Sequence, residues 1–339
     1  MILTGSDVAS LLDVDELLRT LRSGFLAQAR APARGLRVRA DLPGEGTATA
    51  LLPGLLAGIP AYTVKVNAKF PDAVPALRGV VCLHDLNEGS LLAVLDSASL
   101  TAWRTGLAAA LATDVLAAPG AATFGVVGTG AQAAQVLAGL CRLRTITQLT
   151  VTDLVPARAR VFAERHGGPA GPAAQVVSSA REVAAASEIV LLATWSRAPL
   201  LYLADLRPGQ HVTSLGADEP GKSELDVDVL RAATVVVDQE DLARSTGALA
   251  PPGLLDVHPA TFGDVLAGRA PGRGGPGELT VYAPVGLPWQ DLAAAWTAYQ
   301  AATAQGRGLT VDLLALWLRY PLASPGPPHL DEITRSKAA

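Results

Sequence analysis

A glycine-rich turn after a short apolar run is the part of the chain best suited to binding a ligand. It occupies residues 123–133, TFGVVGTGAQA, and continues into a helix-favouring run. A second strand-like run then ends in Asp153. Strand, G-x-G-x-x-A turn, helix, strand and acid in this order are typical of a dinucleotide-binding domain. The alternative is an ordinary glycine turn in some other α/β domain.

The positions of this turn fit a bound dinucleotide. Gly128 permits the tight turn, and Gly130 lets the backbone approach a pyrophosphate. The helix N-terminus offers free N–H groups and a partial positive charge to the phosphates. Asp153 can accept hydrogen bonds from the ribose hydroxyls, which favours NAD because a 2′-phosphate beside a carboxylate is repelled. NADP remains open because two arginines follow on the next predicted helix, Arg158 and Arg160.

Lysine is rare in this chain, and two lysines lie close together on one predicted strand. The full set is Lys65, Lys69, Lys222 and Lys337. Because Arg is the usual cation here, positions that keep Lys indicate a need for a compact ammonium. Along residues 61–70, Lys65 and Lys69 share one face with Thr63 and Asn67, and the other face is apolar. We expect the sheet to bury one face and to direct the cationic row at something outside it; the alternative is a solvated polar face.

The next candidate, Arg104, lies on a predicted helix. A polar N-cap near Ser97 or Ser99 begins this helix, and Arg104 lies beyond its first turn, followed by Thr105. The small residues that follow should let the helix pack tightly against the nucleotide-binding region. The alternative is a surface cation.

Asp218 belongs to the segment 214–226, SLGADEPGKSELD, in which an apolar strand ends at a small-residue turn. In open α/β sheets, ligands bind outside the carboxyl ends of the strands. Asp218 is therefore placed to face a bound nicotinamide. Pro220-Gly221 is also ordinary turn chemistry, so a turn or capping role is the alternative.

In this order around the glycine turn, these segments resemble the ornithine cyclodeaminase/mu-crystallin family. The likeness runs from about residue 37 to residue 304. Its motifs are the strand Lys at position 65, L-D-x-x-x-L-T-x-x-R-T at residues 95–105, G-x-G-x-Q-A at residues 128–133, and G-A-D-x-P-G-K-x-E-L-D at residues 216–226.

The resemblance implies a role for each candidate. The substrate α-carboxylate would be held by Arg37, Lys65 and Arg104, with Arg34 or Arg39 replacing Arg37 if the register differs. Asp218 would be the acid/base at the reacting amine or imine, and Lys65 is grouped with it as catalytic. The cofactor-binding set is Thr105, Gly128, Gly130, Ala131, Gln132, Asp153, Thr194, Gly216, Ala217 and Lys222.

The implied activity is NAD(P)-dependent oxidoreduction at the C–N bond of an α-amino or α-imino acid, by an amino-acid dehydrogenase or ketimine reductase. Family cyclodeaminases are expected to carry a Glu where this chain has Ala50, and a pocket for a second ammonium should want that carboxylate. Other departures are Pro71-Asp72-Ala73 for P-x-N, and YAPVG at residues 282–286 for F-x-S-x-G, which loses a cofactor-side hydroxyl. Ornithine cyclodeaminase remains the alternative enzyme, and a non-catalytic mu-crystallin-like binding protein is the alternative of another class.

The elements that position these residues suggest two domains. Helical spacing over residues 8–29 indicates two helices that meet near Asp13. Strand-like runs at residues 36–42, 47–52, 61–70, 79–83 and 90–95 predict an antiparallel sheet, followed by a helix over residues 99–117. Beyond Pro119-Gly120 strands and helices alternate, which is typical of a doubly wound α/β fold. A helix over residues 291–304 should return to the first domain.

The predicted boundaries are 1–117 with 290–339 for an α+β substrate-binding and dimerisation domain, and 118–289 for a Rossmann NAD(P)-binding domain. The resemblance implies a homodimer formed through the antiparallel sheet. A net charge of −4 gives no basic field, which argues against nucleic acid. The first residues lack a signal-peptide pattern and no apolar run is long enough to span a bilayer. Isolated Cys82 and Cys141 suit the cytoplasm, and the five histidines form no metal-ligand spacing.

Overall fold

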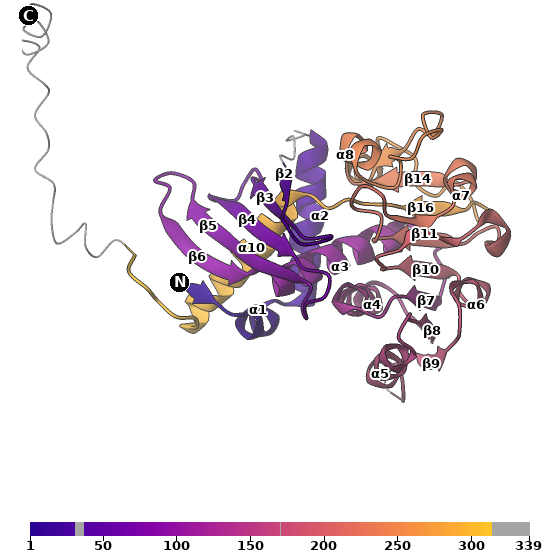
Figure 1. The fold of residues 1–339 in the computed structure, drawn as a ribbon, viewed down its shortest axis with the longest axis horizontal. Coiled ribbons are helices and arrows are strands. Elements are labelled where there is room, and N and C mark those ends of the chain that lie inside the picture. Colours follow the sequence, from indigo (N-terminus) through magenta and orange to yellow (C-terminus); the bar gives the residue numbers. More distant parts are fainter. Residues whose placement is uncertain (31–36, 170, 314–339) are drawn as a thin grey trace, which may run out of the picture.

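Two helix-covered sheets make up the part of the chain that the computed structural model describes, residues 1–30, 37–169 and 171–313 (Figure 1). The predicted candidate Arg34 and the tail from residue 314 lie outside the described residues. The long helix α3 (Ser97–Leu116) leads from the first sheet to the second. Within the described ranges, none of the helices is both long and apolar enough to cross a bilayer.

The first sheet has six strands in the order β1-β6-β5-β4-β3-β2. Strands β2 to β6 pair antiparallel in sequence order, as the alternating patterns predict, whereas β1 pairs parallel to β6. The prediction missed β1 because two residues are too few to show a period. The strands are β1 (Ile2–Leu3), β2 (Val38–Asp41), β3 (Ala48–Gly54), β4 (Ala61–Lys69), β5 (Leu77–Asp85) and β6 (Leu91–Asp96).

Helices from both ends of the chain cover one face of this sheet. They are α1 (Gly5–Leu11), α2 (Val14–Arg30), α3 and α10 (Pro288–Gln305). Thr4 caps α1 through a reciprocal pair of hydrogen bonds with Asp7, and Pro288 begins α10, where a missing N–H costs nothing. Phe25 of α2 packs edge-on against Trp289 of α10, with ring centroids 5.0 Å apart. As predicted, the C-terminal helix returns to the first sheet.

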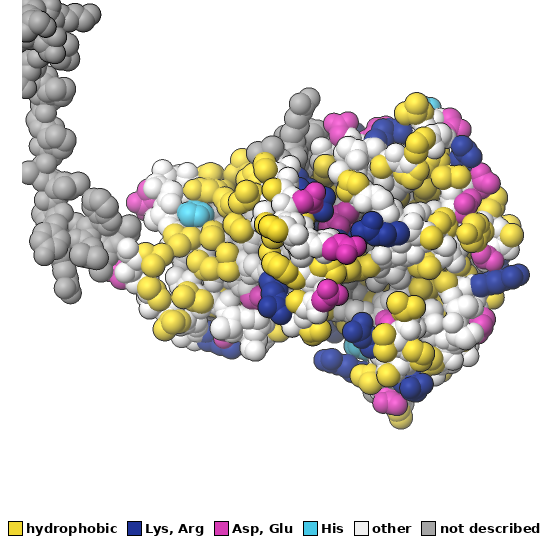
Figure 2. All heavy atoms as spheres, viewed as in Figure 1, with side chains coloured by type: hydrophobic (Ala, Val, Ile, Leu, Met, Phe, Trp, Pro, Cys, Tyr) yellow, Lys and Arg dark blue, Asp and Glu magenta, His cyan; other side chains and the backbone are white. Residues whose placement is uncertain are grey.

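The burial of the two faces of β4 is the reverse of what their polarity suggests. Thr63 and Lys65 are 0% and 2% exposed beneath the covering helices, whereas Val66 on the apolar face is 37% exposed. Figure 2 shows hydrophobic side chains gathered over this outer face. The alternative of a solvated polar face is therefore wrong. Burial of the polar face is possible because Lys65 meets a carboxylate from α10 there.

The second sheet has eight strands, which pair in parallel in the order β15-β14-β16-β12-β10-β7-β8-β9. The order reverses between β7 and β10, which is the switch point where ligands bind in doubly wound sheets. The strands are β7 (Thr123–Val127), β8 (Gln148–Thr152), β9 (Ala173–Val176), β10 (Ile189–Leu192), β12 (His211–Ser214), β14 (Thr234–Val237), β15 (Ala260–Thr261) and β16 (Thr280–Tyr282). The predicted doubly wound sheet is confirmed, and the short β15 was not foreseen.

Short helices connect these strands on both faces of the sheet (Figure 1). They are α4 (Ala131–Leu143), α5 (Pro156–His166), α6 (Ala180–Ala186), α7 (Val227–Ala232), α8 (Glu240–Ser245) and α9 (Phe262–Leu266), with a 3₁₀ turn at Leu203–Asp205. A separate two-stranded sheet pairs β11 (Arg197–Leu201) with β13 (Ser223–Leu225).

Helix α3 packs closely against α4, which joins the two sheets. A Cβ on Gly106 of α3 would overlap Gln135 of α4, and a Cβ on Gly139 of α4 would lie 2.6 Å from the Cβ of Ala110. The small-residue run therefore allows the tight packing that the sequence predicts. This packing carries Arg104 and Thr105 toward the N-terminus of α4, where the glycine turn ends.

Candidate active site

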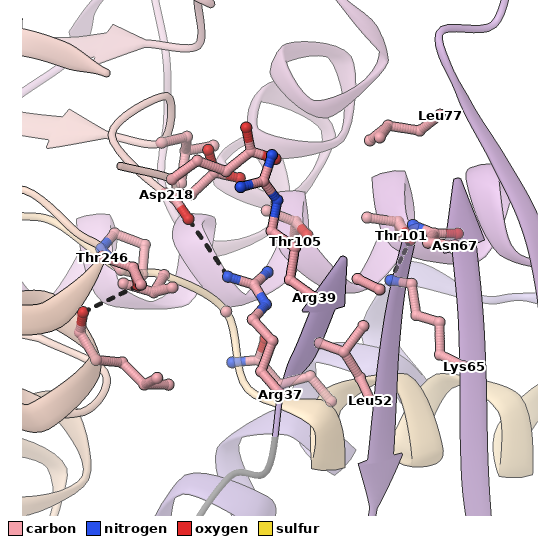
Figure 3. Close-up of a pocket in the computed structure, with 18 of the residues that line it drawn as sticks. Arg37, Arg39, Leu52, Lys65, Asn67, Leu77, Thr101, Thr105, Asp218 and Thr246 are labelled. Atoms are coloured by element: carbon pink, nitrogen blue, oxygen red, sulfur yellow. Dashed lines mark hydrogen bonds between the residues drawn. The ribbon is translucent and has the colours of Figure 1, made fainter. Parts of the chain in front are cut away.

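A cavity of about 430 Å³ lies between the two sheets, and the principal predicted residues line it (Figure 3). Its walls are the inner faces of β3 and β4, helix α3, the turn after β12 and the turn after β16. Figure 3 shows Arg37 reaching Asp218 on one side of the cavity and Lys65 meeting Thr101 on another. The predicted residues along it are Arg37, Lys65, Arg104, Thr105, Gln132 and Asp218, with the alternative candidate Arg39.

Two buried cations share one carboxylate at the inner end of the cavity. Asp291 Oδ1 lies 3.1 Å from Lys65 Nζ and 3.1 Å from Arg104 Nε. The side chains of Lys65, Arg104 and Asp291 are 3%, 7% and 1% exposed. Arg104 also donates to Gln290 Oε1 at 3.0 Å. The alternative of a surface cation is therefore wrong for Arg104, and the group carries one more positive than negative charge toward the cavity.

Burial changes the titration of this group. Desolvation lowers the pKa of Lys65 from 10.5 to about 8, although the Asp291 charge acts in the opposite direction. Burial alone would raise the pKa of Asp291, but the Arg104 and Lys65 charges lower it below its ordinary value. Lys65 also donates to Thr101 Oγ1 at 2.6 Å, which fixes the ammonium at the cavity wall. At neutral pH Lys65 is therefore mainly protonated and Asp291 is ionised.

Asp218 faces the same cavity from the eight-stranded sheet. Its carboxylate accepts from Lys222 Nζ at 2.6 Å and its side chain is 34% exposed. Its carbonyl oxygen accepts from Arg37 Nη1 at 3.3 Å, so the residue before β2 and the turn after β12 touch directly. The structure thus brings the predicted cations of the first half and the predicted carboxylate of the second half to one cavity.

The glycine turn has the geometry that the motif requires. Gly128 has φ +90°, and a Cβ there would lie 2.5 Å from Ala193 O. Gly130 occupies the N-cap of α4, which has no side-chain cap, and a Cβ on Gly130 would meet nothing within 4 Å. The N-terminus of α4 at Ala131 is therefore exposed and has no side-chain cap. This is the fit that a pyrophosphate needs.

Asp153 ends β8 beside this turn. It accepts from Thr129 N at 2.8 Å, from Thr129 Oγ1 at 2.9 Å and from Val155 N at 2.9 Å. Burial alone would raise the pKa of Asp153, but these hydrogen bonds hold it below its ordinary value. Asp153 is therefore an ionised acceptor at the edge where a ribose would lie.

A buried glutamate that the motif analysis left without a role connects the next two strand ends. Glu224 accepts from Thr194 N, Thr194 Oγ1, Ser214 Oγ and Gly216 N, each at 2.7 Å. It thereby fixes Thr194 and Gly216, two predicted cofactor residues, at the carboxyl edge of the sheet; Ala217 beside them is 4% exposed. The sequence signal was the Glu of the E-L-D motif, because an acid at a strand end can tether the neighbouring strand ends.

Asp238 performs a similar task next to Arg104. Its carboxylate accepts from Val285 N at 3.1 Å and Gly286 N at 2.6 Å. Gly286 has φ +93°, and a Cβ there would lie 2.5 Å from Arg104 Nη1. The turn after β16 therefore packs its backbone against the guanidinium. The YAPVG departure from the family pattern leaves Pro284 at the cavity wall in place of a hydroxyl.

Ala50 lines the cavity at the position where a cyclodeaminase-type glutamate is expected. It pairs with Arg39 of β2 on one side and with Asn67 of β4 on the other. Arg39 itself pairs with Asp41 at 3.0 Å and is the more exposed of the two arginines that approach the cavity here. Among the described residues of β3 that line the cavity, none therefore offers a carboxylate to a second substrate ammonium.

Replacing Gly128 with Ala should abolish dinucleotide binding and lower stability by about 1–3 kcal/mol, because the left-handed backbone and the contact with Ala193 O both exclude a Cβ. Calorimetric titration with NADH and urea denaturation measure the two effects. Gly120 has ordinary φ and open surroundings, so Gly120→Ala is the matched control. Unchanged NADH affinity in Gly128→Ala would contradict the assignment of this turn.

Comparison with known proteins identifies the family. The model of the ornithine cyclodeaminase/mu-crystallin family matches residues 1–306. The chain belongs to this family. The family member alanine dehydrogenase of Archaeoglobus fulgidus is 31% identical over 324 residues, which cover 93% of this chain and 99% of that protein.

Solved structures of the ornithine cyclodeaminase/mu-crystallin family share the fold. Thermococcus litoralis Delta(1)-pyrroline-2-carboxylate reductase, in complex with NADH and L-proline, has a TM-score of 0.86 and 28% identity, covering 92% of this chain and 100% of that chain. An archaeal alanine dehydrogenase dimer with bound NAD has a TM-score of 0.81 and 29% identity, covering 92% and 99%. The likeness in fold therefore spans both sheets.

Proposed function

We propose that this chain is an NAD-dependent oxidoreductase that acts on the C–N bond of an α-amino or α-imino acid, as an amino-acid dehydrogenase or ketimine reductase. One observation carries the proposal: Lys65, Arg104 and Asp218 line one cavity together with Gln132, which follows the glycine turn. Its similarity to an alanine dehydrogenase and to a reductase of a cyclic imino acid supports the same reaction class.

The residues present could carry this reaction without a metal. Arg37 supplies a planar guanidinium for a substrate carboxylate, and Lys65 with Arg104 supplies buried positive charge. This grip would fix the position of the substrate Cα, which is what hydride transfer to or from that carbon requires. The nicotinamide, when bound, supplies or takes the hydride at that carbon. In reduction Asp218, directly or through a water that it positions, would deliver the proton to the imine nitrogen.

NAD is the proposed cofactor. The ionised Asp153 at the end of β8 favours a ribose diol over a 2′-phosphate, because like charges repel. The two similar solved structures hold NADH and NAD. The ratio of the NADH and NADPH dissociation constants tests this point, and a preference for NADPH would assign a role to Arg158 or Arg160.

The reaction itself is tested with purified full-length protein, NADH, and a panel of α-keto acids with ammonia together with a cyclic imino acid. The expected result is loss of the NADH absorbance with at least one of them. Ornithine with NAD is the second arm, because ammonia release without net NADH would identify a cyclodeaminase instead. Ala50 in the cavity wall favours the first outcome.

Lys65 makes the proposed reaction dependent on pH. The ammonium is present below its folded pKa of about 8 and is lost as the pH rises through that value. We expect kcat/KM to fall above about pH 8 because the anionic substrate loses a cationic partner, with up to a tenfold fall per pH unit. A bound anion raises the pKa of Lys65, so kcat should change less than kcat/KM. In Lys65→Met the remaining activity should lack this step; a step that persists there would assign it to another group.

We further propose a homodimer formed through the outer face of the six-stranded sheet. A row of apolar side chains crosses four strands there: Val38, Leu51, Val66 and Val80 are register neighbours and are 49%, 41%, 37% and 37% exposed. A contiguous apolar face of this kind is typical of an interface. The similar archaeal alanine dehydrogenase is a dimer.

Val66→Lys tests the dimer, because it buries a charge at the centre of the proposed interface. Light scattering should show a dimer for the wild type and a monomer for the variant. Val161→Lys, on α5 and 62% exposed, should leave the dimer intact. A wild-type monomer at micromolar concentration would contradict the proposal.

We also propose two domains with the predicted boundaries, near residues 117 and 290, because one buried cluster lies mainly under the six-stranded sheet and two others lie mainly against the eight-stranded sheet. A cytoplasmic location is proposed because the free thiols of Cys82 and Cys141 are compatible with a reducing compartment.

A further inference from the structure

A second ion pair crosses the cavity, farther from its buried end. Lys69 Nζ of β4 lies 2.5 Å from Glu219 Oε2 in the turn after β12, and their side chains are 12% and 24% exposed. Both residues line the cavity. Burial alone would raise the pKa of Glu219, but Lys69 and Lys222 hold it below its ordinary value, so the carboxylate is ionised. At this end of the cavity the Lys69 ammonium is therefore already paired with an anion of the protein itself, the Glu219 carboxylate.

Lys69 continues the row that begins with Lys65. The two side chains leave the same face of β4, four residues apart, which separates their Cα atoms by roughly 13 Å. When the side chains stand parallel, their ammonium groups are also roughly 13 Å apart, and two charge-assisted hydrogen bonds of roughly 2.8 Å each leave about 7 Å for a ligand between them. That gap is about the length of a five-carbon dicarboxylate. The wall between the two lysines is small, with Ala48, Ala50 and Asn67.

A substrate held by its α-carboxylate at Lys65 would thus direct its side chain along this wall toward Lys69. A side chain that ends in a carboxylate would meet the Glu219 carboxylate already placed on Lys69. We propose that Glu219 is a specificity-determining residue: its carboxylate takes the place of a substrate side-chain carboxylate on Lys69, so that the cavity selects α-keto and α-imino acids with uncharged side chains and rejects dicarboxylates. This inference rests on the proposed function.

The neighbours of the pair keep Lys69 in place when the Glu219 charge is removed. The ring of Trp195 lies 5.0 Å from Lys69 Nζ and 5.5 Å from Lys222 Nζ. Arg39 also lines the cavity, and its charge helps to lower the pKa of Glu219. Without the carboxylate, two cations of the first sheet therefore remain available to a substrate anion.

The test compares Glu219→Gln with the wild type on two keto acids of equal length, α-ketovalerate and α-ketoglutarate, with ammonia and NADH. The wild type should prefer α-ketovalerate. In Glu219→Gln the ratio of kcat/KM for α-ketoglutarate to that for α-ketovalerate should rise at least about tenfold, because like-charge repulsion is removed. Asp114→Asn breaks a comparably buried ion pair with Arg144 at the other end of α3 and should leave the ratio unchanged.

A double variant, Glu219→Gln with Lys69→Met, identifies the cation. It should lose the gain for α-ketoglutarate while turnover of α-ketovalerate remains. An equal fall for both keto acids in Glu219→Gln would overturn the inference, since the pair would then only hold the turn in place. So would a gain that survives the loss of Lys69.

Binding of the two keto acids to the protein–NADH complex, followed by calorimetry, gives the same ratio without turnover. A protein that oxidises no NADH with any substrate refutes the proposed function, while an unchanged binding ratio refutes only the role of Glu219. The two failures are therefore distinguishable.

Discussion

Replacing Asp218 with Asn should lower kcat by roughly 10²–10⁴-fold, the usual contribution of a positioned acid/base. The amide keeps the shape of the side chain but cannot deliver or take the proton at the substrate nitrogen. NADH affinity should stay within about twofold, because Asp218 faces the substrate cavity and is 34% exposed. Single-turnover kinetics with the best substrate of the panel, beside calorimetric titration with NADH, give both quantities.

Asp228→Asn is the matched control for this experiment. Asp228 is an exposed carboxylate of the same half of the chain, paired only with Arg231 at 3.0 Å among the contacts of the described residues. Its replacement should leave kcat unchanged. A kcat of Asp218→Asn close to that of the wild type would remove Asp218 from the mechanism, whereas a wild type with no turnover would favour a mu-crystallin-like binding role.

Replacing Asp291 with Asn should lower the free energy of unfolding by about 3–5 kcal/mol, the loss seen when one partner of a buried ion pair is removed. Lys65 and Arg104 would then lie together, almost fully buried, with no counter-charge between them. Urea denaturation at pH 7 measures the change. Asp114→Asn, whose carboxylate is 28% exposed, should cost only about 1 kcal/mol or less.

The sign of the pH dependence provides an independent check on Asp291→Asn. Without the Asp291 charge the folded-state pKa of Lys65 falls below about 8, while its unfolded-state value stays near 10.5. The unfolded state of the variant then binds more protons than its folded state over a wider pH range than in the wild type. The stability of the variant therefore rises with pH from a lower starting point. The difference in stability from the wild type should narrow as the pH rises to about 8 and stay constant above that, because Lys65 is then neutral in both folded proteins. A difference that is constant from pH 6 to pH 9 would show that Lys65 is not the destabilised partner.

Local signals were enough to predict most of the fold and part of the site. The period of the strand around Lys65, the caps of the helix around Arg104 and the glycine turn at Gly128 each depend on neighbours within a few residues. The resemblance then joined Lys65, Arg104 and Asp218, and the structure brings these three to one cavity. The assigned roles remain proposals.

The remaining features depend on contacts between distant segments. In the sequence Asp291 looks like an ordinary acid in the first turn of a helix. Nothing near it indicates that its partner is Lys65, 226 residues away. For the same reason the polarity of β4 did not show which face is covered, since a buried Lys is possible only with that partner. Glu219 likewise reads as a turn residue until Lys69 is placed opposite it.

The position of α10 has a consequence for biosynthesis. Leu292 and Ala298 of this helix are fully buried among α2, α3 and the first sheet, and Asp291 is the counter-charge for cations that are translated some two hundred residues earlier. The nascent N-terminal segment therefore cannot close its core when it leaves the ribosome. The nucleotide-binding segment is complete before α10 is made and can fold first. The earliest part of the chain to be made is then the last to reach its native packing.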